Sequence, residues 1–304
     1  MTRLLDRFGP DLARLSGAAL GEAVLAAEGR TVMAEVIAPA PPLLSGTANA
    51  ELMAAFGADL ICINLVDPGA DGPLVGGLEQ LDPAPDGFAG LARLLGRPVG
   101  LNLEPDLESV PGQFRATADQ ARTAASRGAA FVMITANPGR EATISDMETA
   151  VATVRQAAPD LWCLAGKMHQ AGAEEPLGAD TAARLVAAGA QGVLVPLPGT
   201  VPGLSERTAE AMVRTARADG GVAVGTIGTS QEGADPTVLR QLALTAKRIG
   251  VDVHHIGDGG WTGLAPPENI YAYATTIRGV RHTWNRMARN ARAGWTGIDD
   301  KERP

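Results

Sequence analysis

Short apolar segments with strand-like composition alternate along the chain with longer segments of helical periodicity. We predict eight strands, at residues 31–37, 59–66, 97–104, 129–135, 161–167, 191–196, 221–227 and 251–257. The intervening stretches, such as ATADQARTAASRG and PTVLRQLALTAKRIG, are rich in alanine and show the spacing of amphipathic helices. Strands that are apolar almost throughout are typical of a parallel sheet covered on both faces.

Several of the predicted helices end at a glycine just before the next strand, namely Gly57, Gly128, Gly189 and Gly250. The residue after the last helical turn commonly adopts a left-handed conformation, which glycine tolerates best. Eight strand–helix units in 304 residues favour a (β/α)8 TIM barrel, an α/β fold, over the alternative of an open doubly wound sheet.

The regular spacing leaves no linker, so we predict one domain over residues 1–304. Residues 1–30 form an N-terminal helical extension, whose segment GAALGEAVLAAEG is expected to plug the bottom of the barrel. Residues 31–283 form the barrel. The basic segment 284–304 is expected to be a solvated C-terminal tail, with a contact between subunits of a homo-oligomer as the alternative.

Composition narrows the class of partner. The net charge of −8 and the pI of about 5.1 argue against nucleic acid. No apolar stretch approaches the roughly 20 residues of a membrane span, and the charged N-terminus lacks the apolar region of a signal peptide. Cys62 and Cys163 lie in apolar strands, as buried free thiols would. We therefore expect a cytoplasmic protein that binds neither nucleic acid nor membranes.

In a TIM barrel the active site forms at the C-terminal ends of the strands, from the loops that follow them. The first five predicted strands end in reactive side chains, and the last two end in small residues. The candidate catalytic residues are Glu35, Glu104, Lys167 and His169. The candidate substrate-binding residues are Asn64, Asn102, Asn137, Thr226, Gly228, Thr229, Ser230, Gly257, Asp258, Gly259 and Gly260.

Two glycine-rich loops follow strands seven and eight, GTIGTSQEG and GDGG. Many TIM barrels bind phosphate at this position, with help from a helix N-terminus. Glycine lets the backbone approach an anion, and Thr229 and Ser230 add hydroxyl donors. The alternative is a pair of ordinary turns, but their joint position favours a phosphate site.

Lys167 and His169 follow strand five in AGKMHQAG. A desolvated lysine forms a Schiff base with a carbonyl substrate, while a charged one holds a phosphate or an enolate. The alternative is a surface lysine. His169 is a candidate general acid or base, or a metal ligand.

Glu35 lies within an apolar strand, where an unpaired carboxylate costs several kcal/mol. It is either paired with Lys167 across the barrel, or acts as a general base or metal ligand. Asn102 and Glu104 are two residues apart and share one face of their strand. A divalent metal is possible, with Glu35, Glu104 and His169 as candidate ligands. The adjacent His254 and His255 point to opposite sides of strand eight, and the sequence leaves open which faces the interior.

Some chemistries are disfavoured by the absence of their motifs. The chain has no HxH, HExxH or paired-cysteine spacing for zinc, no GxGxxG after a strand, and no GxxxxGK[ST] loop.

The segments GTSQEGAD, HHIGDGG and APPENIYAYATTIRGVRHTW, together with RLLD and AAEGRTVMAEVI, carry a resemblance over essentially the whole chain. They resemble a bacterial family of phosphate-binding TIM barrels, often labelled haloacid-dehalogenase-like hydrolase or phosphonomutase-like and encoded beside sugar-uptake genes. The resemblance implies a sugar phosphate as substrate. The dehalogenase label fits poorly, because that chemistry uses a DxD aspartate and strand one here ends in Glu35 and VIAPAPP.

The leading hypothesis is an enzyme that acts on a small phosphorylated carbohydrate by C–C lyase (aldolase) or isomerase/epimerase chemistry at a carbonyl. Ser230, Gly228 and Gly259 would hold the phosphate, and Lys167 would activate the carbonyl or stabilise an enolate. Glu35 or Glu104 would move the proton, assisted by His169. The alternatives are a metal-dependent hydrolase of a phosphorylated sugar and a non-catalytic sugar-phosphate sensor.

Overall fold

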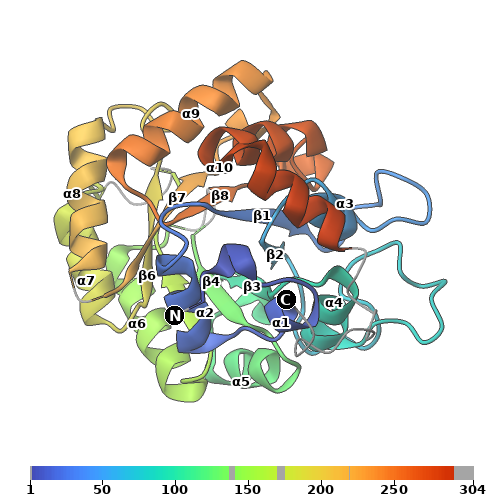
Figure 1. Ribbon diagram of the computed structural model, residues 1–304. Coiled ribbons are helices and arrows are strands. Elements are labelled where there is room, and N and C mark those ends of the chain that lie inside the picture. Colours follow the sequence, from blue (N-terminus) through green and yellow to red (C-terminus); the bar gives the residue numbers. More distant parts are fainter. Residues whose placement is uncertain (1, 137–140, 170–174, 219, 291–304) are drawn as a thin grey trace.

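The computed structural model describes residues 2–136, 141–169, 175–218 and 220–290. Its centre is a closed barrel of eight parallel strands in the order β1-β2-β3-β4-β5-β6-β7-β8, as predicted (Figure 1). The strands are β1 Thr31–Ile37, β2 Leu60–Asn64, β3 Val99–Leu103, β4 Phe131–Ile134, β5 Trp162–Ala165, β6 Gly192–Pro196, β7 Val222–Ile227 and β8 Val253–Ile256.

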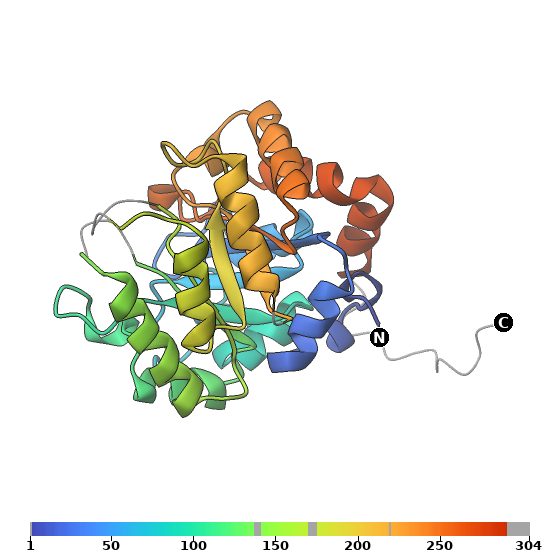
Figure 2. The same ribbon diagram turned by 90° about the vertical axis from the view of Figure 1, so that its left-hand side faces the viewer.

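Helices surround the barrel and connect its strands (Figures 1 and 2). They are α3 Asn49–Ala55, α4 Gly87–Leu95, α5 Ala118–Ser126, α6 Ile144–Ala157, α7 Ala179–Ala187, α8 Glu206–Arg217, α9 Pro236–Ile249 and α10 Pro267–Asn290. Short 3-10 turns are η1 Leu4–Asp6, η2 Gly112–Phe114, η3 Gln231–Gly233 and η4 Gly260–Thr262. The glycines predicted to end helices all have positive φ, from 86° at Gly128 and Gly250 to 112° at Gly57.

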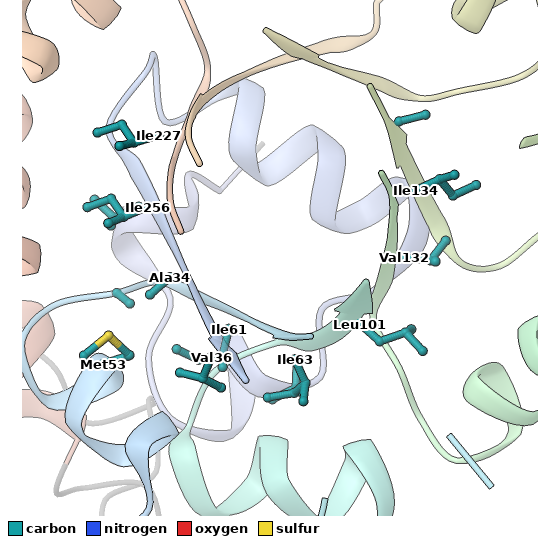
Figure 3. Close-up of a cluster of buried hydrophobic side chains, with 14 of the residues drawn as sticks. Ala34, Val36, Met53, Ile61, Ile63, Leu101, Val132, Ile134, Ile227 and Ile256 are labelled. Atoms are coloured by element: carbon teal, nitrogen blue, oxygen red, sulfur yellow. The ribbon is translucent and has the colours of Figure 1, made fainter. Parts of the chain in front are cut away.

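Side chains alternate along each strand between the helices and the barrel interior. One core cluster joins the outward residues to the helices, and Figure 3 shows Ala34, Val36, Ile61 and Leu101 pointing away from the ring of strands. The second cluster fills the interior and includes Met33, Leu60, Phe131 and Leu164. Because of this alternation, Glu35, two residues after Met33, also points inward.

The N-terminal extension plugs the bottom of the barrel, as expected. It contains α1 Pro10–Ala13 and α2 Gly17–Leu25, and Leu12, Leu20 and Val24 belong to the interior cluster. A Cβ on Gly21 would lie only 3.1 Å from Nε1 of Trp162, so glycine lets α2 approach the start of β5 closely. The apolar side chains of this extension therefore pack against the interior from the N-terminal ends of the strands.

The structure corrects the expectation of a solvated tail for residues 284–290, while residues 291–304 lie outside the described residues. Residues 284–290 continue α10, which changes direction at Gly279, where φ is 73° and ψ is 168°. Arg286 is buried, with 1% of its surface exposed, and its Nε lies 2.6 Å from Oδ1 of the fully buried Asp59. The sequence pattern missed this contact because its partner is 227 positions away in the chain.

Two further expectations concern cysteines and membranes. Cys62 and Cys163 are free and buried, as predicted. Within the described ranges, the longest helices are too short or too polar to cross a bilayer.

Candidate active site

Glu35 is the centre of a buried polar network towards the C-terminal ends of the strands. Its Oε2 lies 2.8 Å from Nε2 of His255, and its Oε1 accepts a hydrogen bond from Nδ2 of Asn102 at 3.2 Å. Oγ1 of Thr135 donates to Oδ1 of Asn102 at 2.8 Å and so fixes the orientation of the amide. These four side chains come from four strands or strand ends and are each at most 2% exposed.

The network settles two alternatives that the sequence left open. His255 faces the barrel interior, whereas His254 points outward, with Nδ1 3.1 Å from the Tyr273 hydroxyl and Nε2 3.0 Å from the Gly29 carbonyl oxygen. The hydrogen-bond partners of the Glu35 carboxylate are His255 and Asn102, which rules out the alternative that Glu35 is paired with Lys167. The two hydrogen bonds that the Glu35 carboxylate accepts offset the free-energy cost of burying its charge.

A second pair of polar residues lies beside this network. Nδ2 of Asn64 donates to Oδ2 of Asp258 at 2.9 Å, which joins the end of β2 to the loop after β8. The other oxygen of Asp258 accepts the backbone N–H of Gly260 at 2.8 Å. Burial raises the pKa of Asp258, and the charge of Glu35 raises it further. These two predicted binding residues are therefore in place, but they bind each other.

Lys167 lies just beyond β5 and is 2% exposed. Its Nζ donates to the carbonyl oxygen of Ala142, in the segment before α6, at 3.4 Å. Burial lowers the pKa of Lys167, and the carboxylate of Glu175 opposes that shift. A buried amine with a lowered pKa has the character that Schiff-base formation requires.

Glu104 and His169 are also buried, at 2% and 8% exposure. Glu104 follows β3, where its backbone bridges to Arg115. In the part of the chain that the structure describes, no three His, Cys, Asp or Glu side chains are grouped so as to hold a metal ion. Glu35, Glu104 and His169 therefore do not form the metal site that the sequence suggested. Asn137 lies outside the described residues.

The loops after β7 and β8 border one pocket of about 390 Å³. Ser230 and Gly259 both line it, as does Glu268 in the first turn of α10. Ser230 has a φ of 77° and Gly259 a φ of 69°, so the chain turns sharply at both. Ser230 and Gly259, predicted to bind phosphate together, thus line one cavity.

Other predicted substrate-binding residues of these two loops have different surroundings. The hydroxyl of Thr229 donates to the carbonyl oxygen of Thr200 at 2.6 Å and so ties its loop to the one after β6. A Cβ on Gly228 would lie 3.1 Å from the Met168 side chain, and the backbone N–H of Gly257 donates to Ile227. Thr226 is fully buried and points into the barrel.

Glu232, in η3 after β7, was not among the residues predicted from the sequence. Glu232 is 3% exposed. Burial raises its pKa, the charge of Asp258 adds to this shift, and the backbone N–H groups of Glu232 and Gly259 oppose it. Glu232 lies in the short polar segment QEG, where side chains are usually solvated. The local sequence therefore does not predict that this carboxyl group is buried.

The comparisons with known proteins identify a family and a fold. A family model described as "Domain of unknown function (DUF7916)" matches residues 5–293. No curated protein matches the chain. Because that description states no activity, the dehalogenase-like and phosphonomutase-like labels and the link to sugar uptake stay predictions.

Many solved structures are similar in fold, and two aldolases are among them. The crystal structure of an archaeal fructose 1,6-bisphosphate aldolase is 16% identical, with 86% of this chain and 99% of that chain covered and a TM-score of 0.53. A structure titled for the mechanism of the Schiff base forming fructose-1,6-bisphosphate aldolase is 16% identical, with 85% and 99% covered and a TM-score of 0.52. At these identities the similarity shows the TIM-barrel fold alone.

Proposed function

The chain belongs to the DUF7916 family, and from its barrel mouth we propose that it is an enzyme of the lyase (aldolase) or isomerase class. Its proposed reaction moves a proton beside the carbonyl group of a small, phosphorylated, carbohydrate-like substrate. The observation that carries the proposal is the buried pair of Glu35 and His255, whose Oε2 and Nε2 atoms are 2.8 Å apart.

This pair has the composition of a general acid–base group. A carboxylate oxygen only accepts hydrogen bonds, so Nε2 of His255 carries the proton that Glu35 receives. In the neutral imidazole, Nδ1 then has a free lone pair and is the atom that accepts a proton. Glu35 fixes this tautomer and stabilises the imidazolium that forms. Glu35 is therefore a positioning residue, and His255 takes over the proton-transfer role that the sequence analysis gave to Glu35 or Glu104.

Lys167 supports chemistry at a carbonyl group. Burial lowers the pKa of Lys167, the direction that an amine nucleophile requires, and in its neutral form the amine would attack a carbonyl to form an imine and release water. A protonated imine then accepts the electron pair of a breaking C–H or C–C bond more readily than the carbonyl does.

The pocket between Ser230 and Gly259 supports a phosphorylated substrate. It opens onto the N-terminus of α10, a helix end whose dipole favours an anion, although its first residue, Pro267, has no backbone N–H. The Ser230 hydroxyl can donate a further hydrogen bond. Glu268 lines the same pocket, so a bound phosphate has to outweigh the repulsion of one exposed carboxylate.

Hydrogen exchange tests the proton-transfer proposal. The protein is incubated in deuterium oxide with phosphorylated ketoses and aldoses, and NMR follows C–H exchange and cleavage. We expect one of them to exchange or cleave, and His255→Gln to slow this by about 10²–10⁴-fold. The control is His282→Gln, which changes an outer histidine. Thermal stabilisation by these compounds without exchange or cleavage would favour the sugar-phosphate sensor instead.

Borohydride reduction in the presence of the active compound tests the imine step. We expect a reduced adduct on the peptide that contains Lys167, and none in Lys167→Arg. Activity without an adduct would remove the imine while leaving acid–base catalysis by His255 in place. The metal-dependent hydrolase is less well supported, because the three candidate ligands are not brought together among the described residues.

A further inference from the structure

Three buried side chains where β7, β8 and η3 meet each have a polar atom without a protein partner. Among the described residues, no hydrogen bond is made by Oγ1 of Thr226, Nδ1 of His255 or Oε2 of Glu232. Thr226 and His255 are fully buried, and Glu232 is 3% exposed. Most buried polar atoms in folded proteins are paired, so three unpaired atoms in one place call for a ligand.

The three side chains face the same space. Thr226 and His255 are partners in the register of β7 and β8, and both point into the barrel. Gly257 lies two residues beyond His255 and so has the same orientation. A Cβ on Gly257 would lie 3.6 Å from Cδ of Glu232, which places that carboxyl group over the interior face above His255.

The hydrogen-bonding capacity of these atoms defines what fits. Nδ1 of His255 offers a lone pair, because Nε2 holds its proton towards Glu35. The Thr226 hydroxyl donates or accepts, and so does the Glu232 carboxyl group when it is protonated. A substrate hydroxyl group matches this set, since it gives one proton and accepts hydrogen bonds through its oxygen.

A phosphate group does not match this inner space. Burial and the charge of Asp258 raise the pKa of Glu232, and burial and the charge of Glu35 raise the pKa of Asp258, so negative charge near this space opposes a second anion. Ser230 and Gly259, by contrast, line the outer pocket, which does not include Thr226, His255 or Glu232. The ends of β7 and β8 thus provide two different environments: a buried inner space and an outer pocket.

We propose that Thr226, His255 and Glu232 form an inner subsite that binds a hydroxyl group of the substrate, with Nδ1 of His255 as the base that takes its proton. This rests on the proposed function and narrows the predicted substrate-binding role of Thr226 to a hydroxyl group of the substrate. In an aldol cleavage, the O–H bond breaks and its proton passes to Nδ1. The oxygen forms a carbonyl group as the neighbouring C–C bond breaks. The electron pair of the broken C–C bond passes to the adjacent carbonyl or imine group, which becomes an enolate or an enamine. The proton held on Nδ1 is then returned to the carbon that lost its C–C bond.

Thr226→Val is the main test, because valine keeps the shape of threonine and removes only the hydroxyl. A hydroxyl without an internal partner adds nothing to the stability of the ligand-free protein, so we expect an unchanged or higher Tm. Thr262 is the matched control: its hydroxyl donates to the carbonyl oxygen of Leu264 at 2.8 Å, so Thr262→Val is expected to lower the Tm.

Binding is measured with dihydroxyacetone, which carries hydroxyl groups and a carbonyl but no phosphate. The chain has four histidines, so the ring ¹⁵N signals of a histidine-labelled sample can be followed individually, and His255→Gln assigns the signal of interest. We expect dihydroxyacetone to move the Nδ1 signal of His255. Thr226→Val and Glu232→Met should each weaken its Kd about tenfold, the effect of one lost hydrogen bond, whereas Glu232→Gln keeps a donor and an acceptor and should retain binding. Thr262→Val should leave the Kd unchanged.

Inorganic phosphate and ethanolamine complete the test. Phosphate binding, measured by calorimetry, should be unaffected by Thr226→Val. The proposal is overturned if Thr226→Val lowers the Tm and leaves the Kd of dihydroxyacetone unchanged, as a structural role would predict. It is also overturned if ethanolamine binds more tightly than dihydroxyacetone, because the subsite would then prefer a cation. Either result can occur while C–H exchange by the wild-type protein persists, so failure here is distinct from failure of the proposed function.

Discussion

Nε2 of His255 and Oε2 of Glu35 are 2.8 Å apart in the closed interior of the barrel, with both side chains almost fully excluded from solvent. The hydrogen bond joins β8 to β1, the two neighbouring strands that close the barrel. Because the carboxylate determines which imidazole nitrogen carries the proton, this one contact fixes the lone pair on Nδ1. His255 and Glu35 thus connect the two strands that close the barrel and also carry the proposed proton transfer.

Glu35→Gln is expected to reverse the tautomer of His255. The new amide nitrogen is a donor, and the remaining oxygen can satisfy only one of the two donors that Glu35 accepts from, His255 and Asn102. The conflict is relieved when the proton of His255 moves from Nε2 to Nδ1, which removes the proposed base. We expect the ring ¹⁵N shifts to report this change, and C–H exchange to fall by about 10²–10⁴-fold.

His254 is the internal control for that experiment, since its Nε2 faces the carbonyl oxygen of Gly29 in both proteins. Glu35→Ala provides a contrast, because it leaves two buried donors without an acceptor and should lower the free energy of unfolding by at least about 2 kcal/mol. An unchanged His255 tautomer together with unchanged exchange in Glu35→Gln would show that Glu35 does not position the base.

Arg286→Gln is expected to destabilise the fold, although the sequence placed Arg286 in a solvated tail. Arg286 and Arg278 both contact the carboxylate of Asp59, which is fully buried. Arg286 also donates to the carbonyl oxygens of Leu4 and Arg7, so it ties the N-terminal extension to α10. Breaking a buried ion pair should cost about 3 kcal/mol in urea unfolding.

The control for Arg286 is Arg281→Gln on the exposed side of the same helix, for which we expect a change within about 0.5 kcal/mol. Equal effects of the two substitutions would contradict the assignment of residues 284–290 to the folded barrel.

The barrel was predictable from the sequence because its signals are local. Strand-length apolar runs recur at regular spacing, and glycines such as Gly128 and Gly250 end the helices between them with positive φ. The alternation of side chains also placed Glu35 and Asn102 at the strand ends, where the structure joins them by a hydrogen bond.

The site itself depended on facts that no local pattern contains. Alternation required one of the adjacent His254 and His255 to face inward, but choosing between them needs the register of β8 against β1. Lys167 and Glu232 follow strand ends in loops, where spacing does not determine direction. Lys167 faces Ala142, and Glu232 folds back over Gly257. Both orientations follow from tertiary packing.

His254 should make the protein sensitive to acid. Burial lowers its pKa to about 3, so the folded protein keeps it neutral while the unfolded chain binds a proton below about pH 6.5. Its contribution to stability is therefore present above pH 6.5 and is lost as the pH falls, by up to about 1.4 kcal/mol for each pH unit. Urea unfolding at pH 7 and pH 5 should differ by about 2 kcal/mol from this residue alone.

His254→Gln is expected to reduce that difference, whatever its effect on the absolute stability. His282→Gln should preserve most of it, because His282 lies near the surface. An equal pH dependence in wild type and His254→Gln would mean that the unfolded chain gains no proton at this position.

Glu232 should have the opposite dependence on pH. Burial and the charge of Asp258 raise its pKa in the folded protein. Below the pKa of the unfolded chain, about 4.3, the carboxyl group is neutral in both states and costs nothing. As the pH rises above that value, the unfolded chain loses the proton first, so the contribution of Glu232 to stability falls until the folded pKa is passed.

Glu232→Gln, which imitates the protonated acid, should therefore be more stable than wild type at pH 7 to 8 and equal to it near pH 4, as measured by urea unfolding. Glu268→Gln is the control, because Glu268 is exposed in the first turn of α10, where its charge favours the helix. A variant less stable than wild type at every pH would show that the N–H groups of Glu232 and Gly259 hold a carboxylate there. A stability gain in Glu232→Gln combined with weaker binding of dihydroxyacetone by Glu232→Met would show that the fold tolerates an unfavourable acid because the inner subsite uses it.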